Sequence, residues 1–127
     1  MIREGIAALN RGDVEDMLAT LDPDVELVPL RGALDGSVYR GHDGMRRWLE
    51  DMKEDWKEFE LRVEDVREIG PGRLLVQATM GLRGRSGVAL DTSAAWLCDM
   101  RDGKAFRIRF FADSAAALEA AQSGSRP

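Results

Sequence analysis

Four β-like segments follow one another in the second half of the chain, and this pattern constrains the fold more than any other feature. They span residues 59–111 and read FELRVEDVREI, RLLVQATMGLRG, GVALDTSAAWLCDMR and KAFRIRFF. The short connections between them, GPG, RS and DG, have the composition typical of turns. Consecutive strands joined by such turns pair antiparallel. The pattern therefore predicts a meander of long strands, and long strands imply a strongly curved sheet.

The last hairpin, MRDGKAF, is compatible with two turns that bring different residues together. A two-residue turn at Asp102 and Gly103 sets Arg101 opposite Lys104, which is an unfavourable pair of like charges. A three-residue loop with a left-handed Gly103 avoids that pair by placing Met100 opposite Lys104. We therefore predict the three-residue loop, which gives the pairs Cys98 with Phe106, Trp96 with Ile108 and Ala94 with Phe110.

This register predicts one continuous apolar face that lines the concavity of the sheet. The face contains Ala94, Trp96, Cys98, Met100, Phe106, Ile108 and Phe110. Alternation of side chains sends Asp99, Arg107 and Arg109 to the outer face. The sequence does not decide which side of the strand that begins at residue 73 faces the concavity. The two rows of that strand are Val76, Ala78, Met80 and Leu82 against Leu75, Gln77 and Thr79. The sequence also leaves open whether Thr92 points into the concavity.

The first part of the chain has helical spacing, interrupted by one short strand. Two short helices are predicted by the apolar residues Ile2, Ile6 and Leu9, and then Val14, Met17, Leu18 and Leu21. Gly12 suits the end of the first helix, and Asp13 suits the cap of the second. The run from Val25 to Val28, closed by Pro29, predicts a strand. Residues 31–41 are rich in glycine and predict a loop that folds over an opening.

A longer helix is predicted after Gly41, and a final short helix is predicted after Asp113, in the segment SAAALEAA. Asp43 suits the cap or first turn of the longer helix, and His42, the only histidine, lies just outside its start. The buried stripe of this helix consists of Met45, Trp48, Leu49, Met52 and Trp56.

Composition excludes several classes of function. One cysteine and one histidine cannot form a disulfide, a thiolate cluster or a histidine-rich site, so we expect no metal and no cofactor. We interpret Cys98 as a packed apolar group rather than a nucleophile. The net charge of -5 argues against nucleic acid as a partner.

The length and the hydropathy of the chain predict its organisation. A chain of 127 residues fits one domain, which we place at residues 1–122, with a frayed tail at 123–127. No apolar run approaches the ~18 residues that a membrane helix needs. The amino terminus has no signal-like pattern. We therefore expect a cytoplasmic protein that does not contact a membrane.

Three stretches, AALNRGDVEDMLATLDPDVEL, YRGHDGMRRWLEDM and RDGKAFRIRFFADSAAALEAA, resemble landmarks of SnoaL-like proteins. These proteins belong to the nuclear transport factor 2-like, or ketosteroid isomerase-like, superfamily. The resemblance covers nearly the whole chain. It implies an α+β fold in which helices wrap a cone-shaped, curved antiparallel sheet, a cystatin-like α+β barrel. It also implies a homodimer that forms through the outer face of the sheet, where Ala95, Leu97 and Phe111 accompany the outward-facing charged residues.

The active sites of the known superfamily enzymes do not carry over to this chain. The oxyanion-holding tyrosine of ketosteroid isomerases falls at Gly5, and their general-base aspartate falls at Val28, before Pro29. Proton abstraction beside a carbonyl needs both a base and a donor, so the resemblance implies that this isomerase chemistry is absent.

Polyketide cyclases and epoxide hydrolases fit no better. The inward faces of the last two strands, where cyclases carry an acid–base histidine and aspartate, here offer only Trp96, Ile108 and Phe110. The Asp-Arg-Asp cluster of limonene epoxide hydrolase-like enzymes has its nearest counterpart in Asp99 and Arg101, which face away from the expected cavity. The superfamily also includes scaffolding and transport adaptors, so the resemblance specifies the fold more closely than the activity.

We therefore expect an apolar cone that binds a small hydrophobic molecule without a recognisable isomerase, cyclase or hydrolase site. The alternative is a SnoaL-like enzyme that acts by acid–base chemistry on a polyketide- or steroid-like substrate. For that alternative the candidates at the mouth are Tyr39, His42 and Asp35. The sequence leaves open whether the chain is catalytic. The expected ligand-binding residues are Val28, Tyr39, Trp48, Met52, Trp96, Cys98, Phe106, Ile108 and Phe110.

Overall fold

The computed structural model describes residues 2–29 and 36–124, and it gives no side-chain placement for the last two of these. The elements follow in the order α1 (Ile2–Arg11), α2 (Val14–Ala19), β1 (Leu21–Val28), β2 (Tyr39–Arg40), α4 (Gly41–Asp55), β3 (Glu58–Gly70), β4 (Arg73–Arg83), β5 (Ala89–Arg101), β6 (Lys104–Phe111) and α5 (Ser114–Gly124). Helix α5 extends two residues beyond the predicted domain boundary at 122, and that boundary stays a prediction. Of the loop predicted at 31–41, residues 31–35 lie outside the described residues. Its last three residues are not loop, because Tyr39–Arg40 form β2, which pairs with β1, and Gly41 begins α4.

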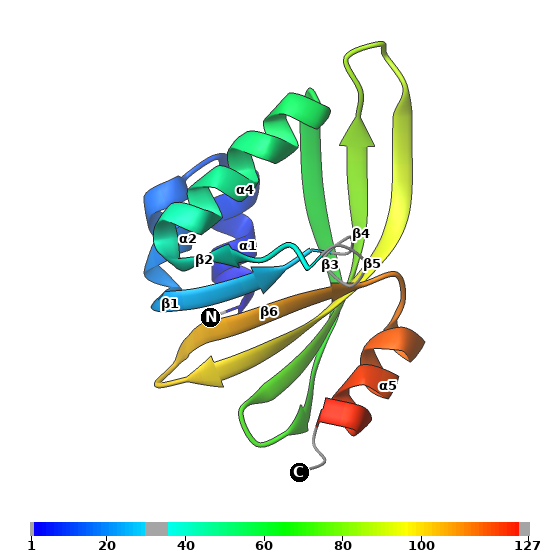
Figure 1. Cartoon of the computed structure of the whole chain (residues 1–127). Coiled ribbons are helices and arrows are strands. Elements are labelled where there is room, and N and C mark those ends of the chain that lie inside the picture. Colours follow the sequence, from blue (N-terminus) through cyan, green and yellow to red (C-terminus); the bar gives the residue numbers. More distant parts are fainter. Residues whose placement is uncertain (1, 30–35, 125–127) are drawn as a thin grey trace.

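The six strands form one open sheet in the order β2-β1-β6-β5-β4-β3 (Figure 1). The predicted meander from β3 to β6 is confirmed, because these strands pair antiparallel in sequence order. Two register shifts between β3 and β4 mark bulges, which bend a sheet. The α+β cone fold is therefore confirmed. The sheet is mixed rather than wholly antiparallel, because β1 runs parallel to β6.

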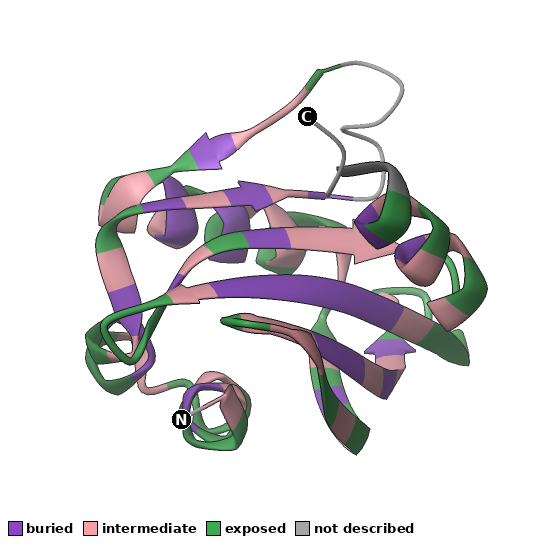
Figure 2. Cartoon of the chain, turned by 90° about the horizontal axis from the view of Figure 1, so that it is seen from below, coloured by how far each residue is buried: buried purple, intermediate pink, exposed green. Residues whose placement is uncertain are grey.

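Helices cover both faces of the sheet. The main core lies between the sheet and the helices α1, α2 and α4, and a second apolar cluster lies between the sheet and α5. Strand β5 is central to both. All five residues from Ala95 to Asp99 are buried, as Figure 2 shows for the middle of the sheet, because successive side chains enter opposite layers.

Local chemistry explains the start of the fold. Gly12 has a φ of 78°, which ends α1, and an Asp13 carboxylate oxygen accepts a hydrogen bond from the Asp16 backbone N–H at 3.1 Å. Both predictions about this junction are confirmed. Strand β1 begins earlier than predicted, at Leu21 rather than Val25. An irregular register with β6 between Leu21 and Glu26 keeps Pro23 out of the ladder.

Helix α4 confirms most of the predicted stripe. Met45, Trp48 and Leu49 are buried, whereas Met52 is half-buried. Trp56 follows the helix in an extended conformation, and its N–H donates to the Met52 carbonyl at 2.8 Å.

The tip of the last hairpin differs from the prediction. Asp102 and Gly103 have φ angles of 52° and 78°, as in a two-residue type I′ turn, and Arg101 lies opposite Lys104. The three-residue loop is therefore wrong. The repulsion of the two cations is offset because Arg101 also forms an ion pair with Asp22 at 3.2 Å.

A β-bulge beyond this turn changes which residues of β5 and β6 lie opposite each other. Met100 pairs with Ala105, but Asp99 pairs with Arg107, so Phe106 has no partner across the ladder. The extra residue shifts the register predicted for this hairpin. The observed pairs further along are Cys98 with Ile108, Leu97 with Arg109 and Trp96 with Phe110.

The structure decides the facing of β4. Val76 and Ala78 are buried in the main core, whereas Leu75 is buried under α5. Gln77 donates a side-chain hydrogen bond to the Ser114 hydroxyl of α5, and the Thr79 hydroxyl donates to the Glu64 carboxylate at 2.5 Å. The polar side chains of this strand therefore face away from the concavity.

Candidate functional site

The concave side of the sheet contains an inner cavity of about 70 Å³ beneath α1. Its walls come from α1, α2, α4 and the inward residues of the four strands β1, β3, β5 and β6, and Thr20 supplies the one polar side chain. The lining residues are Ile2, Gly5, Ile6, Leu9, Met17, Thr20, Leu21, Leu27, Met45, Trp48, Leu61, Trp96, Cys98, Ala105, Ile108 and Phe110. A cavity of this composition favours apolar groups.

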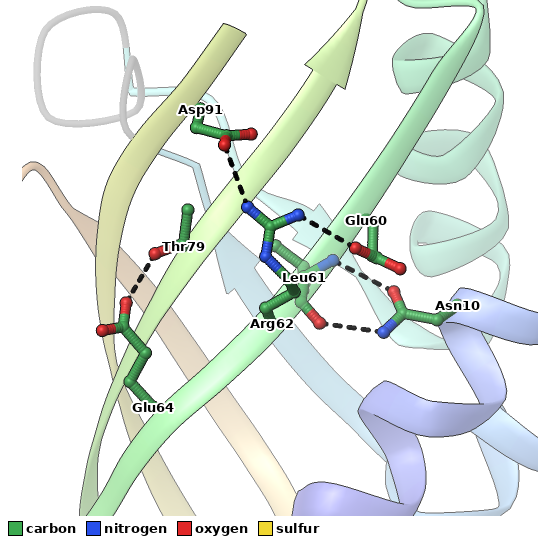
Figure 3. A network of polar contacts seen from close by, with 7 residues as sticks. All are labelled: Asn10, Glu60, Leu61, Arg62, Glu64, Thr79 and Asp91. Atoms are coloured by element: carbon green, nitrogen blue, oxygen red, sulfur yellow. Dashed lines mark hydrogen bonds and ion pairs between the residues drawn. The ribbon is translucent and has the colours of Figure 1, made fainter.

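The side chain of Asn10 anchors α1 over this inner cavity. Its amide nitrogen donates to the Leu61 carbonyl at 2.8 Å, and its amide oxygen accepts from the Leu61 N–H at 3.0 Å (Figure 3). Arg62, the next residue, points to the solvent side and joins Glu60 and Asp91 at 3.1 and 3.2 Å. The polar network of Figure 3 thus holds the helix to β3 without entering the cavity.

A second and larger cavity, which we call the mouth, has a volume of about 630 Å³. It opens between the end of α4 and the strands β4, β5 and β6. Aromatic and aliphatic side chains dominate its lining, and its polar residues are Asp55, Thr92 and Ser93. The full lining is Pro29, Trp48, Met52, Asp55, Trp56, Met80, Leu82, Thr92, Ser93, Ala94, Phe110, Phe111 and Ala112.

Two aromatic residues line both cavities. Trp48 from α4 and Phe110 from β6 are stacked, with ring centroids 6.1 Å apart and planes at 25°. Trp96 packs against Phe110 at 5.3 Å, and Phe59 meets Trp48 edge-on at 6.2 Å. The stacked pair is therefore held from both sides.

Six of the nine residues expected to bind ligand lie on these walls, namely Trp48, Met52, Trp96, Cys98, Ile108 and Phe110. Their role in binding stays a prediction. Val28 does not join them, because strand alternation turns Leu27 inward and pairs Val28 with Arg109 on the outer face. Phe106 is displaced by the bulge, and Arg101 covers its ring at 4.7 Å.

Tyr39, expected both at the ligand and as a catalytic candidate, lines neither cavity. It is buried between β1 and α4, and its hydroxyl donates to the Asp51 carboxylate at 2.6 Å. The guanidinium of Arg47 lies 5.9 Å from the centroid of its ring. This tyrosine therefore connects β2 to α4.

Of the other two catalytic candidates, only His42 lies within the described residues. His42 lies in the first turn of α4 rather than outside the helix, and its Nε2 is 3.1 Å from the Leu21 carbonyl oxygen. Asp35 lies outside the described residues. Within residues 2–29 and 36–124, no cluster of His, Cys, Asp and Glu side chains is arranged to hold a metal ion.

Cys98 is a packed thiol on the wall of the inner cavity. Burial raises its pKa to about 12, and the neighbouring charge of Asp99 acts in the same direction. At neutral pH the group is therefore protonated, as the interpretation of Cys98 as an apolar residue requires.

The mouth contains residues that the sequence reading did not select as ligand contacts. Asp55 lies three residues after Met52 and seven after Trp48, so helical spacing was a signal for it. Met80 and Thr92 are direct partners across β4 and β5, and their common facing follows only from the observed register. Of the polar residues left open in the sequence, Thr92 alone lines a described cavity.

No helix in the described parts of the chain combines the length and apolar character that a membrane span requires.

Comparisons with known proteins agree with this architecture. The model of the SnoaL-like domain matches residues 2–108. The structure of TerC, co-crystallised with polyporic acid, is similar at 27% identity and a TM-score of 0.80, and the match covers 93% of this chain and 92% of TerC. A search of curated protein sequences finds no match.

Two further solved structures show the same fold at lower identity. An NTF2-like protein of unknown function from Burkholderia pseudomallei has 23% identity and a TM-score of 0.79, with 93% of this chain and 92% of that chain covered. A cystatin-fold protein from Novosphingobium aromaticivorans has 18% identity and a TM-score of 0.69, with 87% and 93% covered.

Proposed function

The chain belongs to the SnoaL-like domain family, of nuclear transport factor 2-like fold, and on this premise we propose that it binds a small hydrophobic molecule in the mouth of its cone. The observation that carries the proposal is the mouth itself. Its volume of about 630 Å³ and its lining by Trp48, Met52, Trp56 and Phe110 fit the usual character of a small-molecule site.

Burial is the main source of affinity in such a site. A ligand that buries ~300 Å² of apolar surface gains roughly 7 kcal/mol before the costs of association. The polar side chains at the mouth, Asp55 and Thr92, then orient the ligand rather than supply most of the binding free energy. The co-crystallisation of the similar protein TerC with polyporic acid supports an organic molecule as the occupant.

A pair of matched methionine variants tests this proposal. Met52 and Met100 are both half-buried, but only Met52 lines the mouth. We expect Met52→Gln to weaken binding of N-phenyl-1-naphthylamine about fivefold, because a polar amide loses hydration beneath the apolar ligand. Met100→Gln should change the affinity less than about twofold, since a site outside the mouth leaves the ligand's burial unchanged.

Fluorescence titration of the naphthylamine, with polyporic acid as competitor, measures these affinities. The proposal fails if the wild-type protein binds neither compound, or if both methionine variants weaken the binding equally.

A second candidate is an acid–base enzyme that acts on a polyketide- or steroid-like substrate. The observation in its favour is the Asp55 carboxylate, which shares the mouth with the Thr92 hydroxyl. If Asp55 is a general base, Asp55→Asn should lower kcat at least ~100-fold and leave ligand binding largely intact. Binding is the better supported function, because no second titratable side chain lines the described part of the mouth.

We also propose that the protein forms a homodimer through the outer face of the sheet. Ala95 and Leu97, expected in this interface, are already covered by α5, so the contact falls beside that helix on β6. Arg109 supports this location. Among the described residues, its Nε and Nη2 atoms are buried without a hydrogen-bond partner, and burial together with repulsion from Arg107 lowers its pKa. The neighbouring Arg107 is exposed, so a carboxylate of a second copy can pair with it and offset this repulsion.

Sedimentation velocity tests the dimer. We expect the wild-type chain to sediment as a dimer at micromolar concentration and Arg107→Glu to shift it to monomer, because the variant places a negative charge where the proposed interface needs a cation to meet a carboxylate of the second copy. Arg3→Glu makes the same charge change on exposed α1 and should leave the dimer intact. A wild-type monomer would contradict the proposal.

A further inference from the structure

We infer that the stacked Trp48–Phe110 pair is a partition that limits how deeply a ligand enters the cone, so that it determines the ligand length the protein accepts. This inference rests on the proposed binding function. It adds that the accepted ligand has a ring or other bulky body in the mouth and a tail that ends at Phe110.

The partition follows from the walls of the two cavities. Trp48 and Phe110 are the two residues common to both linings, so their rings stand between the mouth and the inner cavity. The ring centroids are 6.1 Å apart, and this separation leaves no room for another group between stacked rings. A ligand in the mouth therefore contacts one side of the pair while the inner cavity lies on the other.

The volumes of the two cavities indicate which part of a ligand each of them can hold. The inner cavity holds about 70 Å³, roughly half of the ~150 Å³ of an apolar protein cavity that binds benzene. It is too small for an aromatic ring but suits a short alkyl group. The mouth, at about 630 Å³, takes the larger body. A tail that passed the partition would be buried among apolar side chains, with Thr20 as their one polar neighbour.

Phe110 is the member of the pair that controls this passage. Trp48 is 7% exposed and is held by α4 and by Phe59, whereas Phe110 is half-buried and faces the open mouth. Removing the Phe110 ring deletes a wall that both cavities share and should join them into one space. Removing its neighbour Phe111 enlarges the mouth but not the inner cavity, since Phe111 lines the mouth and otherwise packs against the apolar cluster under α5.

A series of 4-alkylphenols, from methyl to hexyl, tests the partition by isothermal titration calorimetry. In the wild-type protein the affinity should stop rising once the tail reaches Phe110. In Phe110→Ala it should keep rising by about fourfold for each further methylene, which is the gain for burying that group. Phe111→Ala removes the same atoms next to the partition and should keep the wild-type dependence on length.

Phe110→Val serves as a second variant if alanine at this position prevents folding, because a β-branched residue suits a strand and still opens part of the wall. The inference is overturned if the wild-type affinity already rises steadily to hexyl, or if the Phe110 variants share the length dependence of Phe111→Ala. These results leave the proposed binding function intact. Absence of binding by every alkylphenol to every variant would instead refute both.

Discussion

Trp48→Ala is expected to lower the free energy of unfolding by about 3–5 kcal/mol. The side chain is 7% exposed and packs at the centre of the main core, where Phe110 stacks on it and Phe59 meets it edge-on. The substitution removes the transfer free energy of a large aromatic group and two aromatic contacts. It also leaves a hole beside an existing cavity, and a cavity adds to the cost.

Trp56→Ala is the matched control for this measurement. Trp56 is also a tryptophan, but it lies half-buried in an extended conformation beyond the end of α4, so its loss should cost about 1 kcal/mol. Urea denaturation followed by circular dichroism gives both values. A loss below about 2 kcal/mol for Trp48→Ala, or equal losses for the two variants, would contradict the position of Trp48 in the core.

Cys98 is expected to react with iodoacetamide at pH 8 about a thousand times more slowly in the folded protein than in the unfolded chain. Burial raises its pKa from 9.0 to about 12, and the thiolate, which is the reactive form, becomes correspondingly rare. Its side chain is also closed off from reagent, since Cys98 is 1% exposed. Mass spectrometry of alkylation with and without urea measures the ratio. Comparable rates in the two states would show that the thiol is accessible.

The same pKa shift predicts a loss of stability at high pH. Above pH 9 the unfolded chain releases the Cys98 proton, whereas the folded protein retains it until about pH 12. Unfolding is therefore favoured increasingly over this interval, by about 1.4 kcal/mol for each pH unit. Below pH 9 both states are protonated and the group contributes no pH dependence. Cys98→Ala should remove this slope from urea denaturation measured between pH 8 and 10.5, and an unchanged slope would contradict the shift.

Local patterns in the sequence were sufficient for the elements other than β2, and for much of the lining of the two cavities. Met45, Trp48 and Leu49 recur at helical spacing, and the same spacing extends to Asp55 in the mouth. Strand alternation likewise predicted Trp96 and Cys98 on the inner wall. These predictions succeed because the periodicity of a helix or a strand alone determines which side of that element each side chain lies on.

The hairpin at Asp102 shows where such reasoning fails. The like charges of Arg101 and Lys104 argued against the observed turn, but a cross-strand pair contributes only about 0.2–1 kcal/mol. Contacts from elsewhere in the chain outweigh it, because Asp22 pairs with Arg101. The bulge at Phe106 then depends on neighbouring strands that no local pattern specifies.

The sequence by itself determined the family and the succession of helices and strands, apart from the short strand β2. Only the tertiary structure decided that β4 turns Val76 inward and Leu75 toward α5, since both rows are apolar and both faces of the sheet are covered. It also divided the cone in two, by bringing Trp48 of α4 onto Phe110 of β6. Periodicity gives the direction of a side chain from its own element, whereas the shape of a cavity depends on the distance between elements that lie far apart in the chain.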